Sequence, residues 1–422
     1  MTAPVADSYS CSSGGMIAGG RFNAPETIAL IGDSLTGKAY GLTSFFWLNG
    51  LNGGKLSLIA NAGISGDTVG DVLSRVDSSY TSSPPGLAGL GPLGYAMVRI
   101  GTNSARAGST IASLAATYTS LLNKIAGYAS RVIILSVPPL GGPEASGNSK
   151  VIDYNAWLSA FAAAHPGNFT FIDDCAGLRD GSNAQIASYF IADGVHFNSA
   201  GVVKCGIDAA AQFGALISAG RPSPVSTNPA DVYPSTPQWV VNPMMAGTGG
   251  SASGGFTGSV SNNWSVSAYG AGFSGSCSKV AADAGDPNQT PWQRITPSAG
   301  PSPTMGESIS ITTAMAGRAI TPADPTQLDV VIELRLNALD SNKIGSVLLW
   351  MQGSGTGEKV FPDLSLRLGG GLLSQTVVLR HKMPREAFAT HAGATLYLYI
   401  SPTTSFSGDV GSIDFRCVTV RG

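Results

Sequence analysis

The first half of the chain alternates two hydrophobic patterns. Short apolar runs rich in β-branched residues are followed by stretches in which apolar residues recur at helical spacing, most clearly at 111–128. Buried strands that alternate with helices predict a parallel sheet covered on both faces. We expect strands at 28–31, 56–61, 95–100, 132–137 and 169–172, and helices at 39–51, 69–76, 111–128, 151–164 and 200–218.

From about residue 241 the helical spacing disappears and short alternating runs replace it. Clusters of Gly, Pro, Asn and Asp separate these runs, which predicts an all-β sandwich of the jelly-roll kind. The expected strands are 259–268, 308–313, 328–336, 346–351, 374–380, 394–400 and 412–420. A proline-rich stretch precedes them and has the composition of a linker. The predicted division is an N-terminal arm (1–24), an α/β domain (25–218), a linker (219–240) and the β-sandwich (241–422).

Composition narrows the classes of partner. A net charge of -2, with only 12% charged residues, leaves no basic face for nucleic acid. No run of about 18 apolar residues is present, so we expect no membrane span. Residues 1–7 lack the basic and apolar regions of a signal peptide, which we expect to be absent or already removed. The abundance of Gly, Ser and Thr is common in extracellular β-rich proteins and favours an extracellular or secreted location.

The cysteines form no metal motif, because none belongs to a C-x-x-C pair. Cys175 and Cys205 flank a candidate catalytic loop and could form a disulfide bond in an oxidising compartment. Cys277 and Cys417 could likewise close the C-terminal domain. The alternative, with Cys11 included, is five buried thiols.

The run T-I-A-L-I-G-D-S at 27–34 ends an apolar strand at a serine. A serine at the carboxyl end of a buried strand, where the chain turns into a helix, is well placed to be a nucleophile. His196 follows the last expected strand, so it can face the same sheet edge. Asp193 can accept a hydrogen bond from the imidazole Nδ1 and aim Nε2 at Ser34, and Gly194 permits the tight turn between them. These positions predict a Ser34–His196–Asp193 catalytic triad.

Acyl transfer also needs hydrogen-bond donors for the oxyanion of the tetrahedral intermediate. The backbone N–H of Ser34 is the first candidate. Gly66 follows the second expected strand, and Asn103 follows the third, within G-T-N at 101–103. Because the carboxyl ends of parallel strands meet at one edge, we expect the Ser34 N–H, the Gly66 N–H and the Asn103 side-chain amide to form an oxyanion hole.

With these blocks in order, residues 25–218 resemble the SGNH/GDSL hydrolase family. Gly32-Asp33-Ser34-Leu35 matches the first block, Gly66 the second, Gly101-Thr102-Asn103 the third and Asp193–His196 the last. The resemblance implies a flavodoxin-like three-layer fold with a five-stranded parallel sheet. It also implies carboxylic ester hydrolysis without a cofactor or metal, with the roles given above for Ser34, His196, Asp193, Gly66 and Asn103. One departure is Ser104, where the family usually has Asp.

A second motif overlaps the first block. Residues 32–38 also fit the P-loop pattern G-x-x-x-x-G-K, but Ala39 stands where a Mg²⁺-binding Ser or Thr is required. That interpretation also leaves Asn103 and His196 without a role. No G-x-S-x-G elbow is present, which disfavours an α/β-hydrolase fold.

The ester itself is left open by the sequence. We expect small acyl groups, acetyl above all, on a carbohydrate or polysaccharide. Alternatives are a general carboxylesterase or lipase on short-chain lipid esters, and a phage-tail or surface glycan-binding protein with an accessory deacetylase domain. The β-sandwich could bind carbohydrate through stacking side chains, the candidates being Trp239, Trp264, Tyr269, Trp292 and Trp350. A calcium site using Asp283, Asp286 or Asp414 is conceivable, although no defined calcium loop is present.

Overall fold

A computed structural model describes residues 26–37, 41–217, 240, 242–285, 290–301, 308–314, 327–353, 365–384 and 394–421. The predicted arm (1–24), nearly all of the linker (219–240), Cys11, Trp239 and Asp286 lie outside these ranges, and the side chain of Trp350 is not described. Contacts divide the chain into two compact units, one of residues 1–41 and 58–196 and one of residues 42–57 and 197–422.

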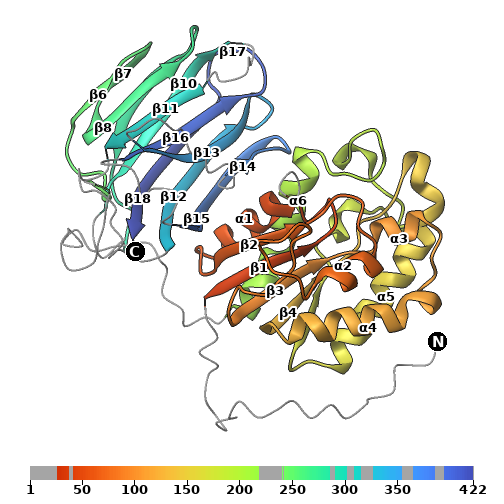
Figure 1. Cartoon of the computed structure of the whole chain (residues 1–422). Helices are drawn as coiled ribbons and strands as arrows, with labels where there is room; N and C mark the ends of the chain where they lie inside the picture. The colour runs from red at the N-terminus through yellow and green to blue at the C-terminus, as the bar shows by residue number, and fades with distance from the viewer. Residues whose placement is uncertain are drawn as a thin grey trace. The chain divides into compact units, whose positions relative to one another are not determined.

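The first unit is built on a five-stranded parallel sheet (Figure 1). The predicted parallel sheet of a flavodoxin-like fold is therefore confirmed. The strand order is β2-β1-β3-β4-β5, so β3 lies at the centre and β1 lies between β2 and β3. The strands are β1 (Thr27–Gly32), β2 (Ser57–Gly63), β3 (Leu93–Arg99), β4 (Ala129–Leu135) and β5 (Phe169–Ile172).

Helices cover one face of this sheet within the same unit. Alternate strand residues such as Ala29, Ile31 and Val98 pack there with Leu121 and Phe161 of two helices in one buried cluster. The helices of the unit are α2 (Val69–Arg75), α3 (Thr102–Arg106), α4 (Ile111–Ala126) and α5 (Asn148–Ala164), and the 3-10 turns are η1 (Gly142–Gly147), η2 (Ala176–Leu178) and η3 (Ala187–Tyr189). The hydrophobic pattern predicted α2, α4 and α5 within a few residues. It missed α3, which has too few residues to show a helical period.

The second unit contains two sheets. The first has the order β15-β12-β18-β10-β9-β7, with β17 on β10, and the second has the order β14-β13-β16-β11-β8-β6. Most pairs are antiparallel, while β6–β8 and β7–β9 are parallel. The strands are β6 (Gly249–Ala252), β7 (Phe256–Gly258), β8 (Val260–Tyr269), β9 (Ser274–Val280), β10 (Trp292–Gly300), β11 (Ser308–Ala314), β12 (Gln327–Asp340), β13 (Ile344–Gly353), β14 (Ser365–Arg367), β15 (Leu372–Pro384), β16 (Ala394–Pro402), β17 (Phe406–Ser407) and β18 (Ser412–Arg421).

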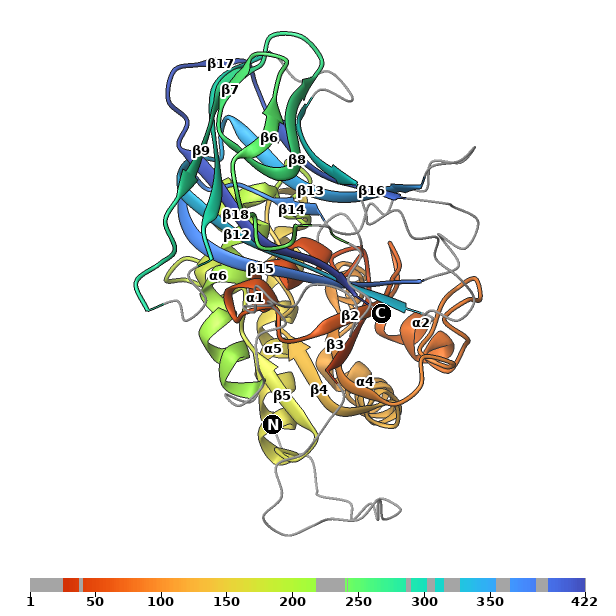
Figure 2. The same ribbon diagram turned by 90° about the vertical axis from the view of Figure 1, so that its left-hand side faces the viewer.

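The two sheets of this unit face each other (Figure 2). Trp264 of β8 meets Phe415 of β18 across the interface, with ring centroids 5.9 Å apart, and both side chains are buried. The alternating runs predicted seven strands: β8, β11, β12, β13, β15, β16 and β18. They missed short strands such as β6, β7, β14 and β17, and also β9 and β10, which are rich in Gly, Ser and Pro.

Two helices belong to the second unit although they fall within the predicted α/β domain: α1 (Gly41–Leu51) and α6 (Ser199–Leu216). Trp47 Nε1 donates to the carbonyl oxygen of Arg367 at 3.0 Å, and Asn52 Nδ2 donates to that of Ala210 at 2.8 Å.

The domain boundaries at 25, 218 and 240 stay a prediction. No helix in the described ranges is both long and apolar enough to cross a membrane.

The structure decides between several alternatives that the sequence left open. Trp264 and Trp292 are 1% and 0% exposed, so neither ring can stack on a sugar. The Asp283 carboxylate bonds Arg335, and both oxygens of Asp414 bond arginines, so these two carboxylates do not form a calcium ligand set. Neither disulfide bond considered from the sequence is formed, because the described cysteines are buried thiols: Cys175, Cys205, Cys277 and Cys417.

Candidate active site

The predicted nucleophile lies in a tight turn after β1, an inner strand of the sheet. β1 ends at Gly32, and the N–H groups of Thr36 and Gly37 donate to the carbonyl oxygen of Asp33 at 3.0 and 3.1 Å. Ser34 is half-buried between the buried side chains of Asp33 and Leu35. The turn thus leaves the serine as the accessible side chain at the carboxyl edge of the sheet.

Ser34 and His196 are in direct contact despite their separation in sequence. Ser34 Oγ lies 2.9 Å from His196 Nε2, and His196 Nδ1 lies 2.6 Å from Asp193 Oδ2. An ionised carboxylate only accepts hydrogen bonds, so Nδ1 carries the imidazole proton and Nε2 accepts from the serine hydroxyl. The structure therefore brings together all three residues of the predicted triad.

The loop at 191–196 has a shape that supports this contact. Gly194 has φ +68°, and a Cβ there would lie 2.1 Å from the carbonyl oxygen of Gly141, so glycine is required. Asp193 Oδ1 accepts from the N–H groups of Val195 at 2.9 Å and His196 at 3.0 Å. Burial raises the pKa of Asp193, but the hydrogen bonds from His196 and these N–H groups outweigh it and lower the pKa overall. The carboxylate is therefore ionised at neutral pH.

Gly66 lies at the exposed tip of the loop after β2. Its φ of +89° favours glycine, and a Cβ added there would meet nothing within 4 Å. The loop is attached to the nucleophile strand, because Ile64 N–H donates to the carbonyl oxygen of Gly32 at 3.0 Å. Gly66 thus borders open space next to the end of β1, as an oxyanion donor must.

Asn103 lies in the first turn of α3, after β3. Its Nδ2 donates to the carbonyl oxygen of Asp67 at 2.9 Å, which links the third block to the second. Ser104, the departure from the family pattern, accepts from Val69 N–H at 3.2 Å through Oγ and ties α3 to the start of α2. The Asn103 amide has a second N–H besides the one in this bond, as the expected oxyanion donor needs.

Asp33 is fully buried, and its Oδ1 accepts from Leu35 N–H at 2.9 Å. Its Oδ2 has no hydrogen-bond partner within the described part of the chain. Burial raises the pKa of this carboxyl to about 7, although the Leu35 bond and nearby Arg99 oppose the shift. Asp33 therefore shapes the turn from below and does not face the substrate side.

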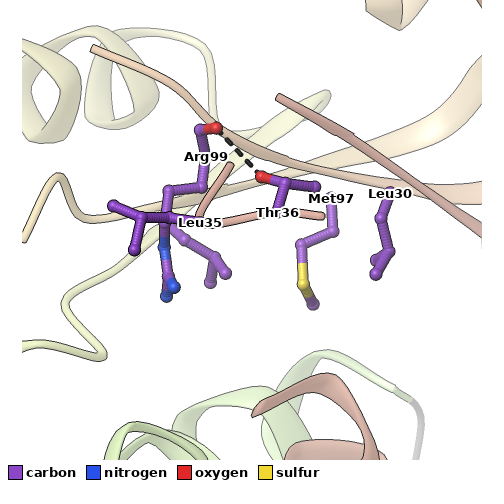
Figure 3. Close-up of a pocket in the computed structure, with 6 residues that line it drawn as sticks. Leu30, Leu35, Thr36, Met97 and Arg99 are labelled. Carbon is purple, nitrogen blue, oxygen red and sulfur yellow. Dashed lines mark hydrogen bonds between the residues drawn. The ribbon is translucent and has the colours of Figure 1, made fainter. Parts of the chain in front are cut away.

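A small apolar pocket lies beneath the turn (Figure 3). Thr36 Oγ1 donates to the carbonyl oxygen of Arg99 at 3.0 Å at its upper edge. None of the lining side chains is more than 5% exposed. The lining residues are Leu30, Leu35, Thr36, Met97, Arg99 and Leu135.

Residues 30–202 match the model of the GDSL-like lipase/acylhydrolase family. This part of the chain is a GDSL-like lipase/acylhydrolase domain, and the protein is an ester hydrolase. The resemblance identified from the four sequence blocks is therefore confirmed.

Solved structures of similar proteins cover the same part of the chain. LAE5, an alpha/beta hydrolase enzyme from the metagenome of Lake Arreo, Spain, is 20% identical over 47% of this chain and 99% of its own, with a TM-score of 0.37. A member of the lipolytic protein G-D-S-L family from Veillonella parvula is 20% identical over 46% and 99%, with a TM-score of 0.35. Axe2, an acetylxylan esterase from Geobacillus stearothermophilus, is 20% identical over 46% and 95%, with a TM-score of 0.34. No curated protein matches the chain.

Proposed function

We propose that the protein is a serine esterase that removes small acyl groups, acetyl above all, from a carbohydrate. The observation that carries the proposal is the hydrogen-bonded chain from Ser34 Oγ through His196 to Asp193, with contacts of 2.9 and 2.6 Å. Serine becomes a useful nucleophile when an oriented base accepts its proton, and this chain supplies that base and its orienting acid.

The reaction then runs in two halves. Ser34 Oγ attacks the ester carbonyl carbon while its proton moves to His196 Nε2, and Asp193 stabilises the imidazolium. The carbonyl oxygen becomes an oxyanion, which accepts from the N–H groups of Ser34 and Gly66 and from Asn103 Nδ2. Collapse breaks the C–O bond, and the leaving alkoxide takes the proton from His196. A water molecule, deprotonated by His196, hydrolyses the acyl-enzyme in the same way.

The preference for a short acyl group is supported by the surroundings of Ser34. Gly66 and Asp193 border the site as exposed residues. The apolar pocket beneath the turn is small and lined by side chains that are at most 5% exposed, so it has no room for a long acyl chain unless they move.

The carbohydrate part of the proposal is supported by one face of the second unit. Strand register puts Tyr269 of β8 and Tyr397 and Tyr399 of β16 on the same face, because they pair with alternate residues of β11. Tyr269 is 63% exposed, and the rings of Tyr397 and Tyr399 stack at 5.5 Å. Aromatic rings with a polar tip pack on sugar rings and hydrogen-bond their hydroxyls. Of these three tyrosines, sequence reasoning singled out only Tyr269.

The direct test is the Ser34→Ala variant with p-nitrophenyl acetate. We expect kcat to fall by about 10⁴–10⁶-fold while the melting temperature stays near that of the wild type. A folded variant that retained the wild-type rate would refute Ser34 as the nucleophile. A series of acyl chain lengths tests the substrate class, because a preference for octanoyl over acetyl esters would favour the lipase alternative.

A further inference from the structure

Arg75, the last residue of α2, is a buried arginine that the reaction above does not use. Its side chain is 4% exposed, so it cannot act as a surface charge. Its Nη2 donates to the carbonyl oxygens of Gly32 at 3.0 Å and Ala62 at 2.9 Å. Its Nε donates to Asp67 Oδ2 at 2.6 Å, and its Nη1 donates to the carbonyl oxygen of Pro85 at 2.5 Å. One guanidinium therefore bonds four acceptors on separate parts of the first unit.

Three of those acceptors belong to the segments that carry the proposed oxyanion donors. Gly32 ends β1 two residues before Ser34. Ala62 lies near the end of β2, where the loop to Gly66 begins. Asp67 follows Gly66, and its carbonyl oxygen accepts from Asn103 Nδ2 at 2.9 Å. Arg75 thus joins Gly32, at the end of β1, to Asp67. Asp67 in turn is adjacent to the Gly66 donor in sequence and hydrogen-bonded to the Asn103 donor.

The chemistry of the contact calls for arginine. A planar guanidinium presents its N–H groups in a fixed fork, so it can bond several acceptors at set angles. A lysine ammonium carries the same charge but cannot span these positions. Leaving a buried charge with fewer acceptors costs free energy, so the four bonds resist displacement of any one segment.

We propose that Arg75 is a positioning residue that holds the Ser34, Gly66 and Asn103 donors in the geometry that the oxyanion requires. This inference rests on the proposed serine esterase mechanism. Arg75 does not contact the substrate, and it acts through the Gly32 carbonyl and the Asp67 loop. Its loss should therefore weaken stabilisation of the transition state more than binding of the ester.

The test uses Arg75→Lys in the full chain, with Arg131→Lys as the matched control. Arg131 lies in β4 near its amino end, away from the site, and its Nη2 also donates to a backbone carbonyl, that of Pro166, at 2.6 Å. Active sites are counted by end-point labelling of Ser34 with a fluorophosphonate. We expect Arg75→Lys to lower kcat per active site by about 10–100-fold with KM changed less than about threefold. We expect Arg131→Lys to leave both constants near the wild-type values.

A double-mutant cycle with Asn103→Ala separates positioning from a general structural role. Arg75→Lys should cost much less in the Asn103→Ala background than in the wild type, because one of the donors it positions is already missing. Binding of a short alkylboronic acid, which forms a tetrahedral anion on serine, should weaken in Arg75→Lys by a factor similar to the fall in kcat/KM.

Three results would overturn the inference. They are a wild-type kcat per active site in Arg75→Lys, an equal cost in both backgrounds, and a loss of activity that matches the loss of labelled sites. Failure of the underlying function would be distinguishable, because the wild-type enzyme would then not be labelled at Ser34, or Ser34→Ala would remain active.

Discussion

Asp193 in the first unit and Asp414 in the second have the same side chain in two different environments. The Asp193 side chain is 42% exposed, and its partners are one imidazole and two backbone N–H groups. Asp414 is 0% exposed, and its two oxygens accept four hydrogen bonds from the guanidiniums of Arg294 and Arg335. The first carboxylate faces an imidazole at an open edge, while the second is neutralised by permanent cations.

The network around Asp414 extends to a tryptophan. The guanidiniums of Arg335 and Arg416 lie 4.3 and 4.0 Å from the centroid of the Trp292 ring, and the indole Nε1 donates to Asp283 Oδ2 at 3.1 Å. Such cation–π contacts stabilise the fold and cover the ring. The two regions therefore show that solvent exposure and the kind of hydrogen-bond partner, not the residue type, distinguish a candidate catalytic carboxylate from a structural one.

Replacing each aspartate with asparagine tests this difference and should give the largest effects. Asp193→Asn should lower kcat/KM by about 10⁴-fold, because the amide favours the wrong imidazole tautomer, with little change in melting temperature. Asp414→Asn should leave kcat of the folded enzyme unchanged but lower the free energy of unfolding by about 3–5 kcal/mol, since two half-buried arginines lose the charge of their shared buried carboxylate. Ester kinetics and thermal unfolding measure both. Similar effects of the two variants on kcat would refute the distinction.

A smaller effect is expected at the oxyanion hole. Asn103→Ala should lower kcat by about 10²–10³-fold with a nearly unchanged KM, because the lost donor acts mainly on the transition state. Asn123→Ala, at an exposed position on α4, is the control and should behave as the wild type. Steady-state kinetics on p-nitrophenyl acetate decide the outcome, and a variant with unchanged kcat would remove Asn103 from the mechanism.

A third carboxylate, Asp33, should make the free energy of unfolding depend on pH. Its pKa of about 7 in the folded protein exceeds the ordinary aspartate value of 3.8, so the folded state binds more protons than the unfolded state between these two pH values. The free energy of unfolding is therefore higher at low pH, where the Asp33 carboxyl is protonated, and falls as the pH rises toward about 7. Asp33→Asn mimics the protonated form, and at pH 8 it should increase the free energy of unfolding by up to about 4 kcal/mol. Urea unfolding at pH 5 and pH 8 tests this. An equal effect at both pH values would contradict it.

The smallest effect concerns the second unit. Tyr269→Ala should leave hydrolysis of p-nitrophenyl acetate unchanged but reduce acetate release from an acetylated polysaccharide several-fold, a cost of about 1 kcal/mol for one stacking ring. Leu372→Ala, which alters another highly exposed apolar side chain, serves as the control. If Tyr269→Ala changed neither activity, the tyrosine face would have no part in binding carbohydrate.

Much of the first unit could be predicted from local sequence. Strands and helices with strong periodicity, such as β1 and α4, lie within a few residues of their predicted bounds. The grouping of Ser34, Asp193 and His196 was also predictable, because residues that follow parallel strands meet at one sheet edge. The roles of those residues stay a proposal until the variants are measured.

Burial was harder to predict, because it depends on which faces pack together. Trp264 sits in an alternating run that looks the same whether a residue faces the core or solvent, and Trp292 begins β10, a strand that the pattern did not reveal. Register and sheet stacking put Trp264 between the sheets and let arginines from neighbouring strands cover Trp292. A preference for aromatic residues in strands therefore could not identify a carbohydrate-binding surface.

The sequence by itself determined the order of the elements and the four blocks that carry the ester hydrolase chemistry, because both follow from local periodicity and short motifs. Only the tertiary structure decided which side chains support those blocks. Arg75 reaches Gly32, Ala62 and Asp67 because the first two strands lie side by side and α2 ends beneath them. Hydrogen bonds between residues distant in sequence leave no periodic signal, so they become visible only when the chain is folded.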